Sequence, residues 1–187
     1  MKKKLAIGFV FLACISLYIL QYQKVNRRYL NPLNIDIYEN ETIRIDDIDI
    51  TPLKAEFINE EKIRKLYPQL INNNESYNSN PIGLYLMKIS CNNNTDEKKN
   101  LDFTQWMIEA DAWGNGINGI FFSALNPDIS ITQKLNAHEK IVVQLPFTMV
   151  KNMFTKKQWK ELKSKNFNIV VSLYPQKIIL KSGNRYR

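Results

Sequence analysis

An N-terminal apolar run is the longest hydrophobic feature of the chain. Residues 5–20 are sixteen consecutive uncharged residues, and Tyr22 extends the run to eighteen. At about 1.5 Å per helical residue, this length reaches about 27 Å, close to the thickness of the hydrocarbon core of a bilayer. We therefore expect a transmembrane anchor at residues 5–22, between a short N-terminus at residues 1–4 and a linker at residues 23–33.

Two other interpretations compete with an uncleaved anchor. A cleaved secretory signal needs small residues at its cleavage site, yet no Ala, Gly or Ser occurs between positions 17 and 54. The second competing interpretation is a lipid-attachment signal centred on Cys14. The chain stays apolar after this cysteine, where a lipidated N-terminus would normally become polar. Three lysines directly precede the run, whereas the basic residues after it begin only at Lys24. The positive-inside rule therefore favours a cytoplasmic N-terminus and an extracytoplasmic remainder.

Beyond the linker, the apolar positions follow the two-residue period of β-strands. Ile43 and Ile45 share one phase and Ile48 and Ile50 the other, which predicts either two strands around a tight turn or one strand with a bulge. A bulge is also expected in the strand at residues 101–111. The other expected strands lie at residues 82–90, 129–132, 140–147, 167–174 and 177–181.

Two short helices interrupt this pattern. Asn59 can cap a helix at residues 60–67, which Pro68 ends, and Thr155 can cap another within "TKKQWKELKSK". The Asn-rich stretch "INNNESYNSNP" is expected to be a loop, and the glycines of "AWGNGINGIFFSAL" predict a hairpin turn. Many short strands without a regular β-α alternation indicate a mainly β fold, an antiparallel two-sheet sandwich over residues 34–183.

The net charge of +8 changes this picture only after it is divided along the chain. Residues 1–28 carry six basic and no acidic side chains. Residues 29–133 carry 8 basic and 16 acidic side chains, and residues 134–187 carry 12 basic and 2 acidic ones. The basic excess lies mainly in the flanks of the anchor and in the C-terminal third, so we do not expect nucleic acid as a partner. The C-terminal lysines either pair with acidic groups across adjacent strands or form a basic face for anionic lipids or wall polymers.

Candidate catalytic and metal-binding groups are few. His138 is the single histidine, and no Ser or Cys lies in a nucleophile motif beside it. A sequence resembling a calcium loop begins at Asp111, but Trp113 and Phe122 stand where ligands are needed. Cys91 is the one cysteine beyond the anchor, which excludes an intrachain disulfide there. We expect no catalytic residue, no cofactor and no metal site.

The three tryptophans are the remaining candidates for contact with a ligand. Trp106 and Trp159 fit core positions of a sandwich. Trp113 stands in a Gly-rich turn, so we expect it to be an exposed ligand contact.

Taken together, these segments resemble the membrane-anchored, immunoglobulin-like extracellular domains of Gram-positive bacteria, akin to the telokin-like immunoprotective extracellular family. The resemblance covers most of residues 35–182 and rests, beside the Lys-rich anchor, on "ETIRIDDIDITPLKAEF", "LYLMKISCNNNTDEKKNLDF", "SALNPDI", "EKIVVQLPF", "FTKKQWKEL" and "IVVSLYPQKIIL". It implies an immunoglobulin-like sandwich that serves as an exported binding or protective module, with no catalytic residues.

The sequence thus predicts a single-pass cell-membrane protein that displays a non-enzymatic domain outside the cell. Its partner is an envelope protein, a peptide or an anionic polymer, and bacteriocin immunity and envelope association are two such roles. An envelope hydrolase and a structural component of an envelope complex are the alternatives.

Overall fold

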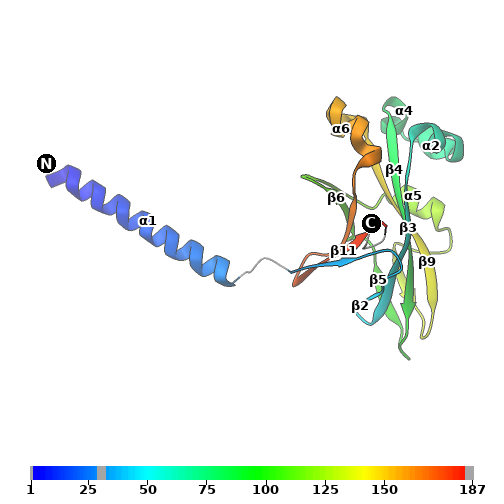
Figure 1. Cartoon of the computed structure of the whole chain (residues 1–187), viewed down its shortest axis with the longest axis horizontal. Coiled ribbons are helices and arrows are strands. Elements are labelled where there is room, and N and C mark those ends of the chain that lie inside the picture. Colours follow the sequence, from blue (N-terminus) through cyan, green and yellow to red (C-terminus); the bar gives the residue numbers. More distant parts are fainter. Residues whose placement is uncertain (1, 29–32, 184–187) are drawn as a thin grey trace. The chain divides into compact units, whose positions relative to one another are not determined.

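The computed structural model describes residues 2–28 and 33–183, with the side chains of residues 2–7, 9, 10 and 28 outside the described part (Figure 1). The chain divides into two compact units, Met1–Leu33 and Asn34–Arg187.

The first unit contains one helix, α1 (Lys2–Arg28). Among the residues that the structure describes, no helix is long and apolar enough to cross a membrane. Part of the predicted anchor, residues 5–7, 9 and 10, lies outside the described side chains. The transmembrane assignment therefore stays a prediction.

The second unit is a mainly β sandwich, as the strand pattern predicts. One sheet has the order β1-β11-β10-β6-β7, and the facing sheet has the order β2-β3-β4-β9. The strands of the first sheet are β1 (Leu33–Ile37), β11 (Gln176–Lys181), β10 (Asn168–Ser172), β6 (Met107–Ala110) and β7 (Trp113–Gly116). Those of the second are β2 (Ile43–Ile45), β3 (Ile48–Ile58), β4 (Ile82–Asn93) and β9 (Lys140–Val150). A separate antiparallel ribbon pairs β5 (Lys99–Asp102) with β8 (Thr132–Leu135).

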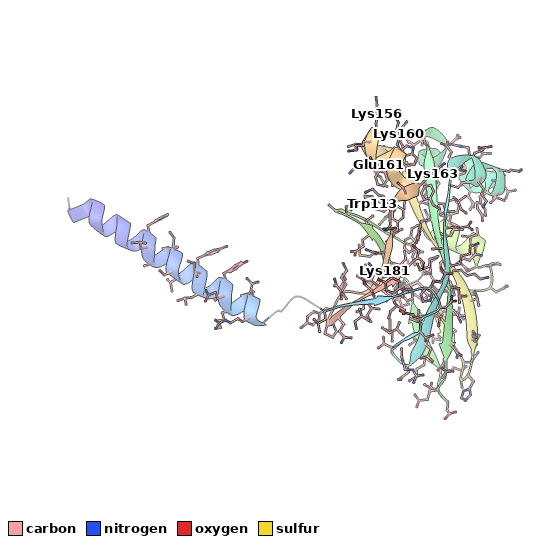
Figure 2. All side chains as sticks on the ribbon, in the orientation of Figure 1. Trp113, Lys156, Lys160, Glu161, Lys163 and Lys181 are labelled. Carbon is pink, nitrogen blue, oxygen red and sulfur yellow. The ribbon has the colours of Figure 1, made fainter. Side chains whose placement is uncertain are left out.

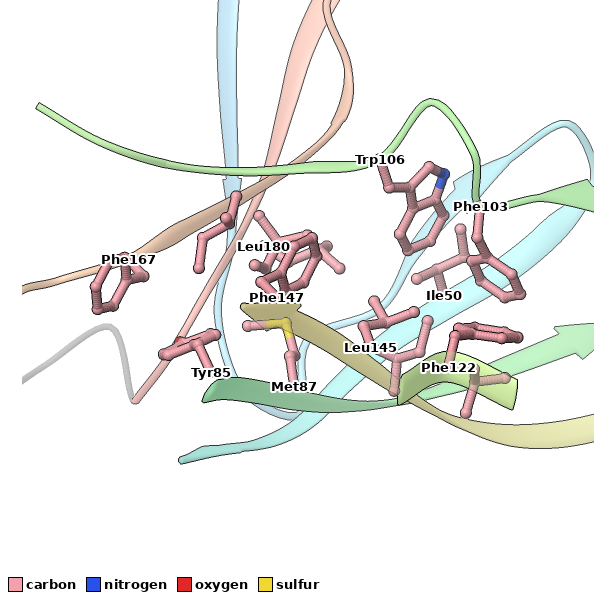
Figure 3. Close-up of a cluster of buried hydrophobic side chains, with 14 of the residues drawn as sticks. Ile50, Tyr85, Met87, Phe103, Trp106, Phe122, Leu145, Phe147, Phe167 and Leu180 are labelled. Carbon is pink, nitrogen blue, oxygen red and sulfur yellow. The ribbon is translucent and has the colours of Figure 1, made fainter. Parts of the chain in front are cut away.

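The space between the sheets holds the larger hydrophobic core. Met87, Leu145 and Phe147 project from the second sheet and meet Leu180 of the first sheet, and Phe167, which directly precedes β10, joins the same core (Figure 3). Trp106 is 5% exposed and packs against Phe103, with the ring centroids 5.0 Å apart, which confirms its predicted place in the core.

A second core covers the opposite face of β4. Leu84 and Leu86 point to this outer face and pack against Ile63, Ile71 and Tyr77. These residues come from the short helices α2 (Glu60–Leu66), α3 (Pro68–Asn72) and α4 (Glu75–Ser79), and α5 (Gly119–Leu125) completes the cover with Phe121. Strand β4 is therefore buried on both faces. The helix predicted at residues 60–67 is confirmed, with Asn59 as its cap. The loop predicted in "INNNESYNSNP" is wrong, because this segment contains the last two residues of α3 and all of α4.

Of the two alternatives for residues 43–50, two strands around a tight turn is correct, because β2 and β3 pair as a hairpin. Asp46 and Asp47 form the turn between β2 and β3, both with positive φ, a conformation that Asp tolerates better than most residues. Arg44 donates to both carboxylate oxygens of Asp49 across the hairpin and lowers the pKa of that carboxyl.

Two other sequence-based boundaries need correction. Residues 101–111 are not one bulged strand, because β5 and β6 lie in different sheets and Asp102 accepts hydrogen bonds from Thr104 in the turn between them. The glycines at positions 114 and 116 lie in β7 rather than in a turn, and the β6–β7 turn is formed instead at Asp111, with a positive φ of 53°. Asn118 then caps α5, which the sequence analysis missed.

The C-terminal strands agree with the prediction in type but not in every bound. The strand expected at residues 129–132 begins three residues later, as β8. The segment between β9 and β10 forms η1 (Lys151–Met153), α6 (Lys156–Glu161) and η2 (Leu162–Ser164), so the described part of the sandwich carries five short α-helices rather than the two predicted.

Three asparagines close the free edge of β9. Asn126 accepts from the backbone N of Gln144 and donates to its carbonyl, both at 2.9 Å. Asn118 donates its backbone N–H to the carbonyl of Pro146, and Asn115 donates its side-chain amide to the carbonyl of Thr148. An edge closed in this way offers few free groups to a pairing strand from another chain.

The substitution Asn126→Ala tests this closure. It removes the partner of both Gln144 backbone groups, and we expect it to lower the free energy of unfolding by about 1–3 kcal/mol. The measurement is urea unfolding of the full chain in a nonionic detergent, followed by tryptophan fluorescence.

The exposed Asn152 supplies the control, because Asn152→Ala should change the free energy by less than about 0.5 kcal/mol. Equal effects of the two substitutions would show that the edge contacts contribute nothing specific.

Candidate functional site

Helix α6 builds the most distinctive surface of the sandwich. Thr155 caps it in a capping box: the N–H of Gln158 donates to the Thr155 hydroxyl, and the Gln158 side chain accepts from the Thr155 N–H. This reciprocal pair confirms the predicted cap and explains why six residues form a helix here. The helix itself contributes no buried residue.

A chain of aromatic contacts holds α6 on the sandwich. Trp159 packs against Phe154 at 6.0 Å between ring centroids, and Phe154 packs against Trp113 at 5.1 Å. Trp113 meets Phe167 at 6.4 Å, and Phe167 meets Tyr85 in the core at 5.0 Å. The outermost helix is therefore connected to the core through aromatic rings.

The exposed side of this region is rich in lysine. We define the lysine face as Lys156, Lys157, Lys160 and Lys163, all of which are exposed. Figure 2 shows Lys156, Lys160 and Lys163 at the α6 end of the sandwich, above Trp113. Within the described residues 34–183, no ion pair involves a member of this face.

Other lysines of the C-terminal third do pair as expected. Lys177 contacts both carboxylate oxygens of Glu109 at 2.8 Å, and Lys181 lies 3.6 Å from Asp36. Lys165 pairs with Asp111. The pairing alternative therefore holds for these three lysines. The lysine face makes no such pair among the described residues, and a lipid or polymer partner for it stays a prediction.

A groove separates α2 from η2 on one side of the lysine face. Its volume is about 560 Å³, and it is lined by Phe57, Asn59, Glu61, Lys62, Lys65 and Lys163. Phe57 forms its floor because Gly83 has no side chain: a Cβ there would stand 2.7 Å from the phenyl ring. A second cleft of about 300 Å³ shares Phe57, Asn59 and Lys163 and continues beneath Trp159.

A third cleft of about 290 Å³ lies on the other side of α6. Trp113, Phe154, Leu162 and Phe167 line its apolar wall, together with the exposed Met153. The structure thus places Trp113 in the wall of this cleft, half-buried, rather than in an exposed turn. Aromatic clefts flanking a cationic helix can accept apolar side chains of a partner whose neighbouring groups are acidic.

The lysine face was not singled out by the sequence analysis, although its spacing was visible. Lys156, Lys160 and Lys163 follow one another at i+4 and i+3, which places them on one side of a helix. The place of Phe57 in the groove could not be predicted from its neighbours in sequence, because the pairing of β3 with β4 brings it to this end of the sandwich.

His138, the candidate general base, lies at the surface of the sandwich. It lies in the turn before β9 with a φ of 59°, and its Nε2 stands 2.9 Å from Asp96. Both side chains are mostly exposed, and among the described hydrogen bonds the His138 ring has no other partner. In the described part of the chain, no three His, Cys, Asp or Glu side chains gather as metal ligands.

Cys91 is buried between the sheets. Desolvation raises the pKa of its thiol to about 12, which keeps the sulfur protonated and unreactive near neutral pH.

Comparison with known proteins identifies a family. A family described as "Domain of unknown function (DUF5028)" matches residues 31–178. No curated protein matches the chain.

Solved structures with a similar course of the chain share little sequence with it. The YjhA protein from Bacillus subtilis has 10% identity and a TM-score of 0.47, over 79% of this chain and 99% of that one. An uncharacterized β-sandwich protein from Clostridium difficile 630 has 12% identity and a TM-score of 0.45, over 80% and 95%. A functionally unknown protein from Listeria monocytogenes EGD-e has 12% identity and a TM-score of 0.47, over 68% of each chain.

Phe154→Ala tests whether the aromatic chain holds α6. Two aromatic contacts together contribute about 1–3 kcal/mol, so local opening should become easier without unfolding of the sheets. We expect amide hydrogen exchange at residues 156–165 to be roughly tenfold faster, with the exchange of β4 unchanged. Hydrogen-exchange mass spectrometry of the full chain in nonionic detergent gives both values.

Met153→Ala is the matched control, because Met153 is adjacent in sequence and 52% exposed. If both substitutions leave the exchange of α6 unchanged, the helix is held by other contacts.

Proposed function

The chain belongs to the DUF5028 family, and we propose that it is a non-enzymatic binding or protective module displayed on the outer side of the cell membrane. Residues 5–22 act as a single-pass anchor with a cytoplasmic N-terminus, and the immunoglobulin-like sandwich lies outside the cell. The uncharged run and its three preceding lysines support this arrangement, as does the resemblance to the telokin-like immunoprotective extracellular family.

The lysine face and the clefts beside it are the proposed recognition surface. The observation that carries this proposal is a cluster of exposed lysines, without ion pairs among the described residues, between clefts lined by Trp113, Trp159 and Phe57. Charges that no internal partner neutralises are available to an external one.

An acidic peptide or protein segment fits this surface better than a phosphate-rich polymer. The clefts of about 290 Å³ and 300 Å³ match apolar side chains, which such a polymer lacks. Lysines at the rim would meet the acidic groups that flank those side chains. Association with an envelope protein and immunity against a bacteriocin are two roles that such binding would serve.

No observed feature favours the hydrolase alternative. His138 and Asp96 lie exposed on loops, and the hydrogen bonds of the described residues bring no hydroxyl or thiol to the imidazole. A base without a nucleophile does not make an acyl-transfer site.

The compartment has a direct test. In intact cells, an added protease should degrade the sandwich, and the chain should stay with the membrane fraction after an alkaline carbonate wash, because an apolar helix resists extraction. A Cys14→Ser variant is the control that separates a spanning helix from a lipid anchor, since only a lipidated chain would then be released.

A mature chain beginning after Leu20, or a C-terminal reporter facing the cytosol, would overturn the proposed display.

The recognition surface is tested by charge reversal. An exposed ion pair contributes about 0.2–1 kcal/mol, so Lys156→Glu, Lys160→Glu and Lys163→Glu together should raise the Kd by roughly tenfold. The probe is a fluorescent peptide that alternates glutamate with leucine, titrated against the full chain in nonionic detergent, and binding should weaken as salt rises.

The matched control reverses three exposed lysines elsewhere, Lys98→Glu, Lys134→Glu and Lys140→Glu, which changes the net charge equally. Equal losses in the two variants would show non-specific attraction. Tighter binding of polyphosphate than of the peptide would favour a polymer as the partner.

A further inference from the structure

The turn between β10 and β11 exposes two large apolar side chains in succession. Leu173 is 57% exposed and Tyr174 is 66% exposed, although the strands on both sides of the turn bury most of their apolar residues. We refer to Leu173 and Tyr174 as the hairpin tip. Such a pair is costly to keep in water and is typical of a contact surface.

The hairpin tip lies at the same end of the first sheet as the start of β1. Strands β1 and β11 are neighbours in that sheet. The side chain of Asp36 forms an ion pair with Lys181, and the N–H of Glu39 donates to the carbonyl of Gly183. Because residue numbers rise together on both sides of these contacts, β1 and β11 run parallel. Leu33, which is 74% exposed, and the residues just before Gln176 are therefore at one end of the sheet. Figure 1 shows the start of β1 and this hairpin on the same side of the sandwich.

The lysine face lies at the other end of β10. Helix α6 and η2 directly precede this strand, whereas the hairpin tip directly follows it. The five residues of β10 place the two features about 17 Å apart along the strand.

The length of the chain keeps the hairpin-tip end near the membrane, if residues 5–22 are the anchor. Helix α1 ends at Arg28, and the six residues after Tyr22 rise about 9 Å. Five further steps to Leu33 reach at most about 18 Å. The end of the sandwich that carries Leu33 thus stays within about 27 Å of the bilayer surface.

We propose that Leu173 and Tyr174 insert into the interface of the lipid bilayer and orient the sandwich with its lysine face directed away from the membrane. The inference rests on the anchor in the proposed function and adds an orientation to it. A tyrosine ring suits this position because its apolar body contacts acyl chains while its hydroxyl stays among the headgroups. Leucine adds apolar area that water no longer has to cover.

The orientation explains why the two exposed surfaces differ in chemistry. The tip carries uncharged apolar groups, which suit lipid, and the opposite end carries lysines, which suit an acidic partner arriving from outside. A lysine face pressed onto anionic headgroups would instead be unavailable to such a partner.

Fluorescence quenching in nanodiscs tests the orientation. The full chain carries Cys14→Ser, so that a new cysteine is the only reactive thiol beside the buried Cys91. An environment-sensitive dye is attached at Leu173→Cys in one sample and at Lys156→Cys in another, with one chain per disc of zwitterionic lipid. The quenchers are a nitroxide near the headgroup end of the acyl chain and a water-soluble nickel chelate.

We expect the dye at position 173 to be quenched several-fold more by the lipid nitroxide than by the chelate, and the dye at position 156 to show the reverse. Tyr174→Ser should move the dye at position 173 toward chelate quenching, whereas Met153→Ser, which alters another exposed side chain, near α6, should not.

Each other result overturns the inference. If the chain stays in the disc but the dye at position 173 is exposed to water, the insertion of the hairpin tip is overturned and the anchor is not. If the chain separates from the discs, the proposed anchor is overturned as well. Lipid quenching at position 156 reverses the orientation. If the dye at position 173 is protected from the chelate only when a disc holds two chains, the hairpin tip contacts a second copy of the chain and not lipid.

Discussion

Burial of β4 on both faces is the constraint on which the rest of the sandwich depends. One face of this strand carries Tyr85 and Met87 into the space between the sheets, and the other carries Leu84 and Leu86 outward. A strand with two apolar faces needs cover on two sides. The first sheet supplies one cover, and the short helices α2 to α5 supply the other. Neither α3 nor α4 exceeds five residues, so their stability comes from this packing rather than from helix propensity.

Helix α6 stands outside that constraint, and this sets it apart as a place for recognition. It covers neither face of β4 and buries no residue of its own, and it is held by its capping box and a chain of aromatic contacts. The segments with the fewest buried contacts are those that proteins most often use for binding, because they can adjust without cost to the core. A rigid two-layer body with a lightly held cationic helix at one end is a suitable scaffold for capturing a partner.

The parts of the structure that the sequence predicts are those decided by neighbouring residues. Asn59 and Thr155 cap their helices through local hydrogen bonds, and Asp46 and Asp47 turn the chain within one hairpin. What the sequence does not predict depends on distant partners. The break between β5 and β6 arises because the two strands join different sheets, although the Asp102–Thr104 turn was a local signal for it. The clefts beside α6 combine residues from β3, β4 and β7 with those of the helix, so no single stretch of sequence contains them.

Two of the three asparagines that close the β9 edge are also chemically labile. Asn115 and Asn118 each precede a glycine, whose backbone nitrogen can attack the side-chain amide with little steric hindrance, so that ammonia leaves and a succinimide forms. Hydrolysis of one succinimide carbonyl leaves aspartate, with a carboxylate in place of the amide, and hydrolysis of the other leaves isoaspartate. At position 118 the carboxylate no longer donates to the hydroxyls of Thr148 and Tyr77, and at position 115 it faces the carbonyl oxygen of Thr148. Deamidation during ageing would therefore place negative charge against the strand and reopen it to pairing between molecules.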